Sequence, residues 1–541
     1  MFLQTCQGKR HSDCRGVDGH RGTAYPATRS PRSAAALVRC PTVADIVVVG
    51  AGMGGMAAAA RLAARGHSVR VVEQSTTHGG KLGSYRRDGF VFDTGPSLLT
   101  LPAVYRDLFL KTATSRKNAA LEDNVGLVGL DPAFAYRWAD GASAVLPGSN
   151  PRKVADALGD ALGGKTASEW LALSRRSGAI WAATRGPFLE SPVDGPMKLM
   201  RQLGKFRDVQ TIAPFTSLRR LGQQHLTDPR LRMYFERYAT YAGSDPRNAP
   251  AALAVIPFVE QTFGAWHIEG GLAQLSAALY ERCLQQNVTF NFGSAVSQVV
   301  VDGGRAVGVR LTDGQVLSAN IVVSDADAGQ LYNELIDDKS ANRVRRRLNR
   351  VAPSVSGFVM LLALRDTTPA MQHHTILFPS DYDAEFDAIF GRKPRPVVDP
   401  AVYICRPGDR TMHPDGHESW FVLVNAPRNG PQRGVDWRAP GVADQYADHL
   451  LQVMADRGFD VRDRLLWREI RSPAWLEDAS LTPGGSIYGT SSNGSRAAFL
   501  RPSNRSPIPG LFLVGGSAHP GGGLPLVGMS AAIVAELIGP A

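Results

Sequence analysis

The stretch ADIVVVGAGMGGMAAAARLAARGHSVRVVEQ, residues 44–74, predicts the fold class of this chain of 541 residues. A first strand is predicted at Ile46–Val49, a continuous β-branched run that is typical of a strand buried on both faces. An Ala-rich helix is expected over Met56–Arg65, and Gly66 ends it. A second strand follows at Ser68–Val72. This order of strand, glycine-rich turn, helix and strand predicts an α/β fold with a parallel sheet.

The glycines of the turn keep the spacing GxGxxG, and each has a physical task. Gly50 permits the tight turn, Gly52 lets the backbone approach a diphosphate, and Gly55 lets the helix pack close to the strand. Free N–H groups at the helix start, beside Gly54, attract phosphate together with the helix dipole. Glu73 closes the second strand, where a carboxylate accepts hydrogen bonds from both ribose hydroxyls. The unit therefore predicts a Rossmann-type dinucleotide site, and the acidic residue disfavours NADP and leaves FAD and NAD.

Two later segments are also rich in glycine. HGGKLGSYRRDGFVFDTGPSLLT, residues 78–100, opens on a glycine pair. PGLFLVGGSAHPGGGLPLVGMSAAIVAEL, residues 509–537, contains a predicted strand at Leu511–Val514, a glycine-rich crossing and a predicted helix. Ordering consecutive glycines is costly because each loses much backbone entropy. We expect a cofactor to lie against this bare backbone.

Together these segments resemble the bacterial phytoene desaturase family of carotenoid desaturases, within the amine-oxidase-like flavoproteins. The stretch Gly-x-x-x-His-Pro-Gly-x-Gly-x-Pro of that family corresponds to Gly515–Pro525 here. The resemblance covers roughly residues 45–537, strongly at both ends and thinly in the middle. It implies FAD as the cofactor, held by Gly50, Gly52, Gly54, Gly55, Glu73, Gly79, Gly80, Lys81, Gly95, Pro96, Val299, Gly515, Gly516, Gly522, Gly523, Leu524 and Pro525.

The predicted architecture is a discontinuous Rossmann-type FAD-binding domain with an inserted α+β substrate domain. Residues 287–327 alternate and turn like a β-meander, and a residue near Val296–Val299 is expected to contact adenine. The glycines of residues 266–272 either serve that unit or form the turn that begins a helix. Strands at 354–364, 402–405 and 420–424 are expected to form the floor of a cavity. The predicted FAD-binding domain takes residues 45–115, 262–340 and 475–541, and the substrate and membrane-associating domain takes residues 116–261 and 341–474.

The charge and motif pattern of the chain indicates which classes of partner to expect. The net charge is +11, but residues 1–44 contribute seven basic and two acidic residues, so the rest is only mildly basic. That N-terminal arm is predicted to be disordered or non-native. We find no zinc-ligand spacing and no nucleic-acid module, and predict no metal and no nucleic-acid partner. The five cysteines form no CxxC pair, which favours a reduced, cytoplasmic protein.

No run of 18 apolar residues predicts a transmembrane helix. The segment Met197–Val209 puts apolar and basic residues on different helical faces, as a helix at a membrane interface does. An ordinary surface helix would show the same pattern, and the family resemblance favours the membrane. A second helical face carries arginines that contact either solvent or anionic lipid headgroups: Arg343, Arg346, Arg347 and Arg350. We expect a cytoplasmic protein that associates peripherally with the membrane.

The resemblance implies FAD-dependent desaturation of a long isoprenoid, phytoene or a later carotenoid intermediate. A hydride passes to FAD and then to oxygen or a quinone, while a proton leaves the neighbouring carbon. His519 is the candidate proton acceptor, although it could instead fix the turn before Pro520. Further candidates are Asp245, Glu236 and Arg237. The alternatives are an isomerase-type relative that uses reduced FAD, and an amine or porphyrinogen oxidase.

Overall fold

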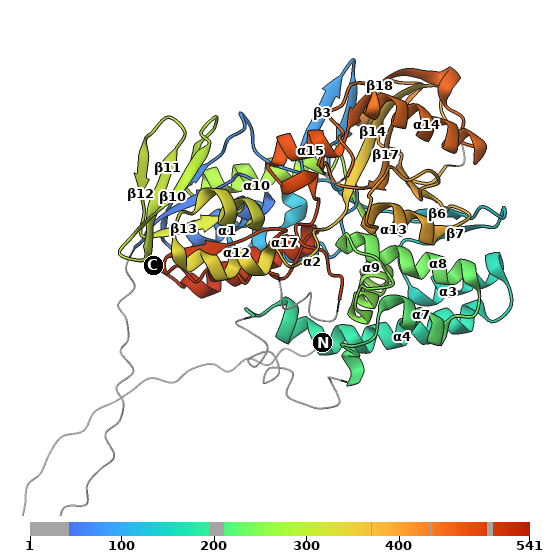
Figure 1. Ribbon diagram of the computed structural model, residues 1–541, viewed down its shortest axis with the longest axis horizontal. Coiled ribbons are helices and arrows are strands. Elements are labelled where there is room, and N and C mark those ends of the chain that lie inside the picture. Colours follow the sequence, from blue (N-terminus) through green and yellow to red (C-terminus); the bar gives the residue numbers. More distant parts are fainter. Residues whose placement is uncertain (1–42, 194–209, 369–370, 433, 495–500) are drawn as a thin grey trace, which may run out of the picture. The chain divides into compact units, whose positions relative to one another are not determined.

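The computed structural model describes residues 43–193, 210–368, 371–432, 434–494 and 501–541 (Figure 1). Nearly all of the predicted N-terminal arm and the predicted interfacial helix Met197–Val209 therefore lie outside the described residues.

A five-stranded parallel sheet is built from strands that are far apart in the sequence. Its order is β19-β13-β1-β2-β9. The strands are β1 (Asp45–Val49), β2 (Ser68–Val72), β9 (Thr289–Asn291), β13 (Ile321–Ser324) and β19 (Leu511–Leu513). The central strand β1 is buried on both faces, as its β-branched run predicts.

Each face of this sheet packs against its own layer. Ile46 and Val48 of β1 face the first layer, which consists of α1 (Met53–Ala63), α2 (Ala103–Lys111), α10 (Ala273–Gln285) and α17 (Leu524–Ile538). Val47 and Val49 face the second layer, an antiparallel meander of β10 (Val296–Asp302), β11 (Arg305–Leu311) and β12 (Val316–Ser318). This three-layer arrangement confirms the predicted Rossmann-type α/β fold.

Two details differ from the sequence prediction. The first helix begins at Met53 rather than Met56, because Gly52 is the last extended residue and the helix already includes Gly54 and Gly55. The expected meander over residues 287–327 is also shorter. Its outer strands β9 and β13 leave it and pair in parallel with β2 and β1, and such long-range pairing has no local signal.

A second, mixed sheet has seven strands in the order β18-β14-β17-β16-β15-β6-β7. The strands expected at 354–364, 402–405 and 420–424 are three of them. In chain order the strands are β6 (Phe134–Arg137), β7 (Ser143–Leu146), β14 (Ser356–Arg365), β15 (His374–Leu377), β16 (Val402–Cys405), β17 (His417–Ala426) and β18 (Leu465–Arg471).

Helices pack on both faces of the second sheet. One core includes α3 (Pro151–Leu162), α4 (Thr166–Thr184), α7 (Leu218–His225), α8 (Pro229–Glu236) and α13 (Tyr382–Phe390). Another contains α14 (Val442–Asp456) and the start of α15 (Pro473–Ser480). The helix α9 (Val255–Phe263) lies against α4, and α12 (Asn342–Leu348) carries the arginine face. Arg343, Arg346, Arg347 and Arg350 are exposed, and Arg350 lies just beyond that helix.

A hairpin links the second glycine segment to the second sheet. Its strands are β3 (Ser84–Arg87) and β4 (Phe90–Asp93), and Phe90 and Phe92 pack against Leu361 and Phe421 of the seven-stranded sheet. A short pair, β5 (Leu127–Gly129) with β8 (Trp266–Ile268), adds another connection between distant segments. The hairpin thereby holds the glycine segment against the seven-stranded sheet.

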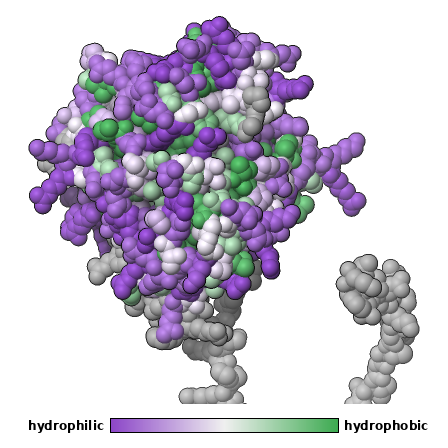
Figure 2. All heavy atoms as spheres, turned by 90° about the vertical axis from the view of Figure 1, so that its right-hand side faces the viewer, coloured by the Kyte–Doolittle hydropathy of each residue, from purple (hydrophilic) through white to green (hydrophobic). Residues whose placement is uncertain are grey.

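The surface is mostly hydrophilic on the face shown in Figure 2, where hydrophobic residues gather in small separate areas. In the described part of the chain, no helix combines the length and the apolar character needed to cross a bilayer.

Candidate functional site

Glycines from three distant segments meet at the start of α1. The N–H of Gly79 donates to the Ala51 carbonyl at 2.9 Å, which fastens the second glycine segment to the first turn. A Cβ on Gly80 would lie 3.3 Å from the Cα of Gly52. A Cβ on Gly54 would lie 2.8 Å from the Cα of Gly515 in the C-terminal crossing. The backbones approach too closely for any side chain, so the structure brings together the segments that the sequence assigns to one cofactor.

Two further glycines are required by packing alone. A Cβ on Gly55 would overlap the carbonyl oxygen of Gly50, which itself has a left-handed φ of 98°. A Cβ on Gly95 would overlap the carbonyl of Lys81, and Pro96 follows directly. These contacts hold α1 against its strand and the chain of residues 79–96 against itself.

The Glu73 carboxylate lies at the end of β2, beside the glycine turn. It accepts hydrogen bonds from the N–H groups of Ala51, at 2.7 Å, and Ser75, at 2.8 Å. The N–H of Ser294 donates to the Glu73 carbonyl at 2.8 Å, so the connection between β9 and β10 runs alongside. Val299 is further along, paired with Val309 and buried in the core below the meander. Its predicted adenine contact remains a prediction.

Asp325 is a site residue that the sequence analysis missed. It follows β13 directly, and its carboxylate lies against Gly52 and Gly54 at the start of α1, where the N–H groups of Gly54 and Gly55 act on it. These are the donors that the glycine motif offers to a diphosphate. Burial raises the pKa of Asp325 to about 7, while these N–H groups oppose the rise. An acidic residue at the carboxyl end of a buried parallel strand is the sequence signal that could have found it.

Replacement of Asp325 by asparagine is expected to remove a pH dependence of FAD binding. Between pH 8 and pH 6 the wild-type carboxylate takes up a proton and ceases to repel the diphosphate, so FAD affinity rises by about threefold to tenfold. The neutral amide of Asp325→Asn keeps the affinity nearly constant over that range. Fluorescence titration of the flavin-free protein with FAD at pH 6, 7 and 8 measures this. Asp327→Asn is the matched control, and an unchanged pH slope in Asp325→Asn would contradict the assignment.

The C-terminal crossing is held by an arginine that the sequence analysis also missed. Arg501 donates to the carbonyls of Gly516 at 2.7 Å, Thr490 at 2.9 Å and Tyr488 at 3.1 Å. Burial lowers the pKa of Arg501 to about 10. The Tyr488 ring lies against Gly522, where a Cβ would come within 2.5 Å of it. Arg501 thus joins the backbone of residues 488–490 to the glycine-rich crossing.

The remaining predicted cofactor residues lie at the two ends of this crossing. The ammonium of Lys81 lies 3.4 Å from the carbonyls of Ser486 and Ile487. Gly523 caps the start of α17 with a left-handed φ of 103°, and Leu524 and Pro525 are the first helical residues. The Tyr105 hydroxyl donates to the Leu524 carbonyl at 2.9 Å and fixes this helix start.

His519 is buried and has partners in the fold. Its Nε2 lies 3.0 Å from the Ser191 carbonyl, and because a carbonyl only accepts, this nitrogen carries the proton. Its ring meets Phe188 edge to face at a centroid distance of 5.1 Å. These contacts suit the fixing of the turn, and the role as proton acceptor remains a prediction. The two carboxylates named as further candidates are paired with arginines: Asp245 with Arg247 and Glu236 with Arg219.

The glycine pair before α10 has a structural explanation. The Asp93 carboxylate accepts from the N–H groups of Leu272, at 2.8 Å, and Ala273, at 2.9 Å. A Cβ on Gly271 would lie 2.9 Å from the same carboxylate. Burial raises the pKa of Asp93 to about 6. The structure therefore supports the interpretation of this glycine pair as a helix start.

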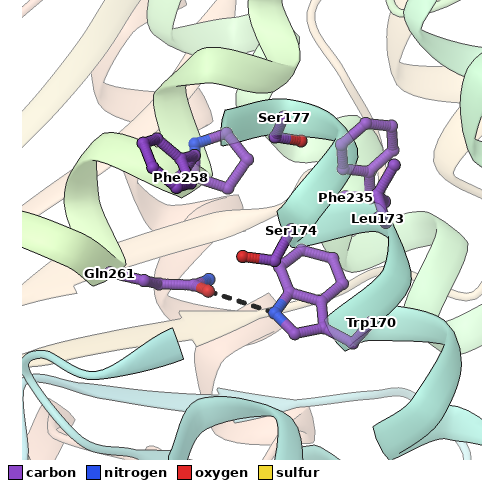
Figure 3. Close-up of a pocket in the computed structure, with 8 residues that line it drawn as sticks. Trp170, Leu173, Ser174, Ser177, Phe235, Phe258 and Gln261 are labelled. Atoms are coloured by element: carbon purple, nitrogen blue, oxygen red, sulfur yellow. Dashed lines mark hydrogen bonds between the residues drawn. The ribbon is translucent and has the colours of Figure 1, made fainter. Parts of the chain in front are cut away.

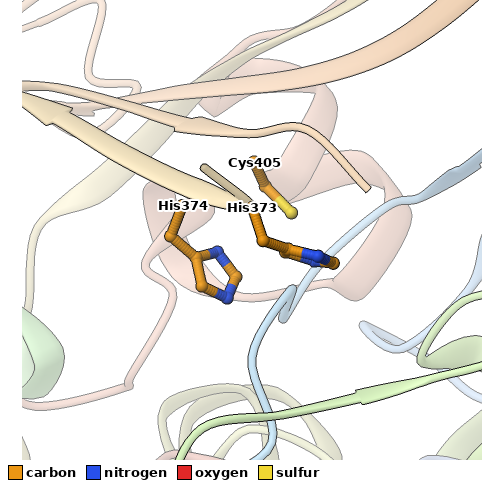
Figure 4. A group of neighbouring side chains, drawn as sticks. All are labelled: His373, His374 and Cys405. Atoms are coloured by element: carbon orange, nitrogen blue, oxygen red, sulfur yellow. The ribbon is translucent and has the colours of Figure 1, made fainter. Parts of the chain in front are cut away.

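A group of nitrogen and sulfur atoms lies between β15 and β16. In the described part of the chain, His373, His374 and Cys405 place such atoms within 4.8 Å of one another (Figure 4). The Tyr403 hydroxyl already bonds His374 Nδ1 at 2.8 Å, and burial raises the pKa of the Cys405 thiol. A cysteine binds a metal ion as the thiolate, and burial disfavours the thiolate of Cys405. This environment therefore favours a neutral hydrogen-bonding cluster. The predicted absence of a metal remains a prediction.

A narrow crevice lies between α4, α8 and α9 (Figure 3). It has no room for a water molecule, so it is not a passage for a long substrate. Its lining residues are Trp170, Leu173, Ser174, Ser177, Phe235, Pro257, Phe258 and Gln261. The hydrogen bond from Trp170 Nε1 to Gln261 Oε1, 3.0 Å long, crosses one side of it.

Comparison with known proteins gives a consistent result. The family model described as flavin containing amine oxidoreductase matches residues 53–538. The chain is 32% identical to a hydroxyneurosporene desaturase of Rubrivivax gelatinosus, over 91% of this chain and 93% of the relative. It is 30% identical to a zeta-carotene-forming phytoene desaturase of Myxococcus xanthus, over 91% and 93% of the two chains. A solved structure of putrescine oxidase has the same fold, with a TM-score of 0.61 and 14% identity over 92% of this chain and 99% of that one.

Proposed function

Because the chain belongs to the family of flavin containing amine oxidoreductases, we propose that it is a FAD-dependent desaturase that introduces a carbon–carbon double bond into a carotenoid. The observation that carries this proposal is the 32% identity to a hydroxyneurosporene desaturase over almost the whole chain. The meeting of the glycine segments at α1 supports the same cofactor. Phytoene or a later carotenoid intermediate is the proposed substrate.

The residues around α1 fit a bound FAD. The turn at Gly50–Gly55 and the start of α1 would hold the diphosphate, Glu73 the ribose, and the backbone of residues 79–81 and 515–525 the ribityl chain and ring. A Cβ on Gly523 would meet no atom within 4 Å, so this end of the crossing borders open space, whereas Gly522 is packed against the Tyr488 ring. When bound, FAD accepts the hydride that leaves the substrate.

The other tasks fall to the chain itself. The strands and helices of residues 116–261 and 341–474 are proposed to align the polyene and exclude water, since their cores are rich in aliphatic and aromatic side chains. A proton must leave the neighbouring carbon, and His519 is the proposed acceptor. Oxygen or a quinone is the proposed final electron acceptor, because the sequence contains no second dinucleotide motif.

We further propose that the protein works at a membrane surface, from which it draws an apolar substrate. Phe215, which is 86% exposed, and Phe263, which is 40% exposed, support this proposal. The ring of Phe263 lies 6.3 Å from that of Trp181, and the Arg185 guanidinium lies over the same indole at 5.8 Å. Aromatic and cationic side chains grouped in this way are typical of a membrane interface.

Replacement of both Phe215 and Phe263 by serine is expected to weaken vesicle binding about tenfold, because two rings no longer leave water for the interface. Flotation with vesicles of phosphatidylcholine and phosphatidylglycerol measures the bound fraction. The matched control is Val316→Ser with Val398→Ser, which removes two exposed apolar side chains elsewhere. Equal flotation of the two double variants would speak against this membrane surface.

The desaturase proposal is tested without oxygen. The purified, FAD-loaded protein is mixed with liposomes that contain phytoene or neurosporene, and flavin absorbance and extracted pigments are followed together. Bleaching of the oxidised flavin band with new, red-shifted polyene bands is the expected result. Pigments that change geometry without flavin reduction would indicate an isomerase, and peroxide formed from amines in air would indicate an amine oxidase.

A further inference from the structure

A buried arginine lies in the part of the fold proposed to hold an apolar chain. Arg237 follows α8 and is 8% exposed. Among the described residues, no carboxylate forms an ion pair with it, and the one hydrogen bond of its side chain goes to the Tyr241 hydroxyl at 3.2 Å. A guanidinium carries five N–H donors, so most of its hydrogen-bonding capacity is unused within the described residues.

Two tyrosine rings flank this guanidinium. Its Cζ lies 5.1 Å from the ring centre of Tyr241 and 5.8 Å from that of Tyr403. Both tyrosines are partly exposed, yet burial raises the pKa of each. The guanidinium is therefore flanked by two tyrosine rings that keep some accessible surface.

Further polar atoms around Arg237 also lack partners. Tyr136, Tyr382 and His374 are buried and interact electrostatically with the guanidinium. The hydroxyls of both tyrosines and the Nε2 of His374 have no hydrogen-bond partner. Buried polar atoms are normally paired, so this part of the core holds an unusual number of polar groups whose hydrogen-bonding capacity is unused.

Two buried carboxylates, Glu260 and Glu385, act electrostatically on the guanidinium, and within the described residues neither forms an ion pair with it. Glu260 accepts from the hydroxyls of Tyr241, at 3.1 Å, and Tyr238, at 2.6 Å, so it reaches Arg237 through Tyr241. Behind it the chain of hydrogen bonds continues through Tyr234 to Gln261 and ends at Trp170 (Figure 3). The network fixes Tyr241 and leaves the other side of Arg237 available.

The same cluster reaches the glycine segment proposed to contact the flavin. The Tyr403 hydroxyl lies 2.7 Å from Ser97 Oγ, and Ser97 follows Gly95 and Pro96 directly. Tyr403 also bonds His374, which belongs to the group shown in Figure 4. A ligand atom at Arg237 would therefore lie close to the proposed reaction centre.

We propose that the Arg237 guanidinium, positioned by Tyr241, binds a hydroxyl or carbonyl oxygen of the substrate, so that the enzyme acts on an oxygen-bearing carotenoid in preference to a hydrocarbon. This inference rests on the proposed desaturase function and adds the class of substrate. A planar guanidinium that donates two N–H groups suits an oxygen acceptor, and the tyrosine rings accommodate the adjoining hydrocarbon. A hydrocarbon in the same place would leave the buried donors unpaired, which is how polar sites reject apolar analogues.

The test compares neurosporene, a hydrocarbon, with hydroxyneurosporene, which carries a hydroxyl group. Binding is followed by quenching of tryptophan fluorescence, and turnover by pigment analysis, for wild type, Arg237→Met, Arg237→Lys and Tyr241→Phe. We expect wild type to favour hydroxyneurosporene at least about tenfold in binding and in kcat/KM. Arg237→Met is expected to remove most of that preference by raising KM for hydroxyneurosporene, while neurosporene changes by less than about threefold. Arg237→Lys and Tyr241→Phe are expected to show a preference for hydroxyneurosporene between those of wild type and Arg237→Met.

Matched controls separate this effect from damage to the fold. Tyr446→Phe removes a buried hydroxyl that donates to the Val397 carbonyl, and Arg457→Lys alters an arginine that donates to the carbonyls of Leu377 and Pro400. Both should keep the wild-type preference, and all variants should keep their FAD. Equal binding of the two carotenoids by wild type, or an unchanged preference in Arg237→Met, would overturn the oxygen site. Arg237-dependent binding without any desaturation would support the site and overturn the proposed reaction.

Discussion

Replacement of Gly55 by alanine is expected to yield a protein that is purified without FAD and is less stable by about 3–5 kcal/mol. The added Cβ would overlap the carbonyl oxygen of Gly50 and would lie 3.3 Å from the Cβ of Asp325. Neither neighbour can yield, because Gly50 donates to the Val72 carbonyl at 2.8 Å and Asp325 is bound to the start of α1. The helix must move away from β1, and the diphosphate donors move with it.

Flavin absorbance after purification and the free energy of unfolding in urea measure this effect. Gly408→Ala is the matched control, because a Cβ at Gly408 would meet nothing within 4 Å and the residue needs no left-handed backbone. It should keep its FAD and change stability by less than about 1 kcal/mol. A Gly55→Ala protein with a full flavin content would contradict the close packing of α1 against its strand.

Replacement of Arg501 by methionine is expected to abolish stable FAD binding with a loss of about 3–5 kcal/mol in stability. Methionine fills a similar volume but leaves the carbonyls of Tyr488, Thr490 and Gly516 without their donor. Each buried acceptor left unpaired costs about 1–3 kcal/mol. Once the segment that contains Tyr488 and Thr490 moves away from Gly516, the Tyr488 ring no longer packs against the glycine-rich crossing at Gly522.

The neighbouring arginine supplies the control for this experiment. Arg505 is exposed and its guanidinium lies only over the Phe512 ring, at 5.7 Å. Arg505→Met should therefore change the melting temperature little and keep the flavin. Arg501→Lys should lose nearly as much FAD binding and stability as Arg501→Met, because one ammonium group cannot donate to three carbonyls that lie in different directions. Normal flavin content in Arg501→Met would show that the crossing is held by other contacts.

Much of the cofactor region could be predicted because its signals are local. The β-branched run of β1, the spacing of Gly50, Gly52 and Gly55, and the acidic end of β2 lie within one continuous stretch, residues 44–74. Backbone conformation and the periodicity of buried positions depend on neighbouring residues, so the strand, the turn and the helix can be predicted from the sequence. The sequence predicts the start of α1 three residues too late, because the low helix propensity of glycine obscures the first turn.

The missed residues have no local signal of this kind. Asp325 reaches the start of α1 from a strand that lies about 270 residues later, and Arg501 reaches three carbonyls in two different segments. Arg237 was noted in the sequence only as a candidate for proton transfer. Its place between Tyr241 and Tyr403 depends on the packing of a helix end against a strand of another segment.

The Rossmann-type unit, the cofactor and the family of this chain could be predicted from the sequence, since they rest on glycine spacing and strand patterns. Tertiary packing places β9 and β13 in the parallel sheet and Asp325 at the helix start. It also decided that Arg237 and its polar neighbours form one cluster beside Ser97. The physical reason is that backbone conformation depends on adjacent residues, whereas the partners of a buried polar side chain are chosen by the packing of distant segments.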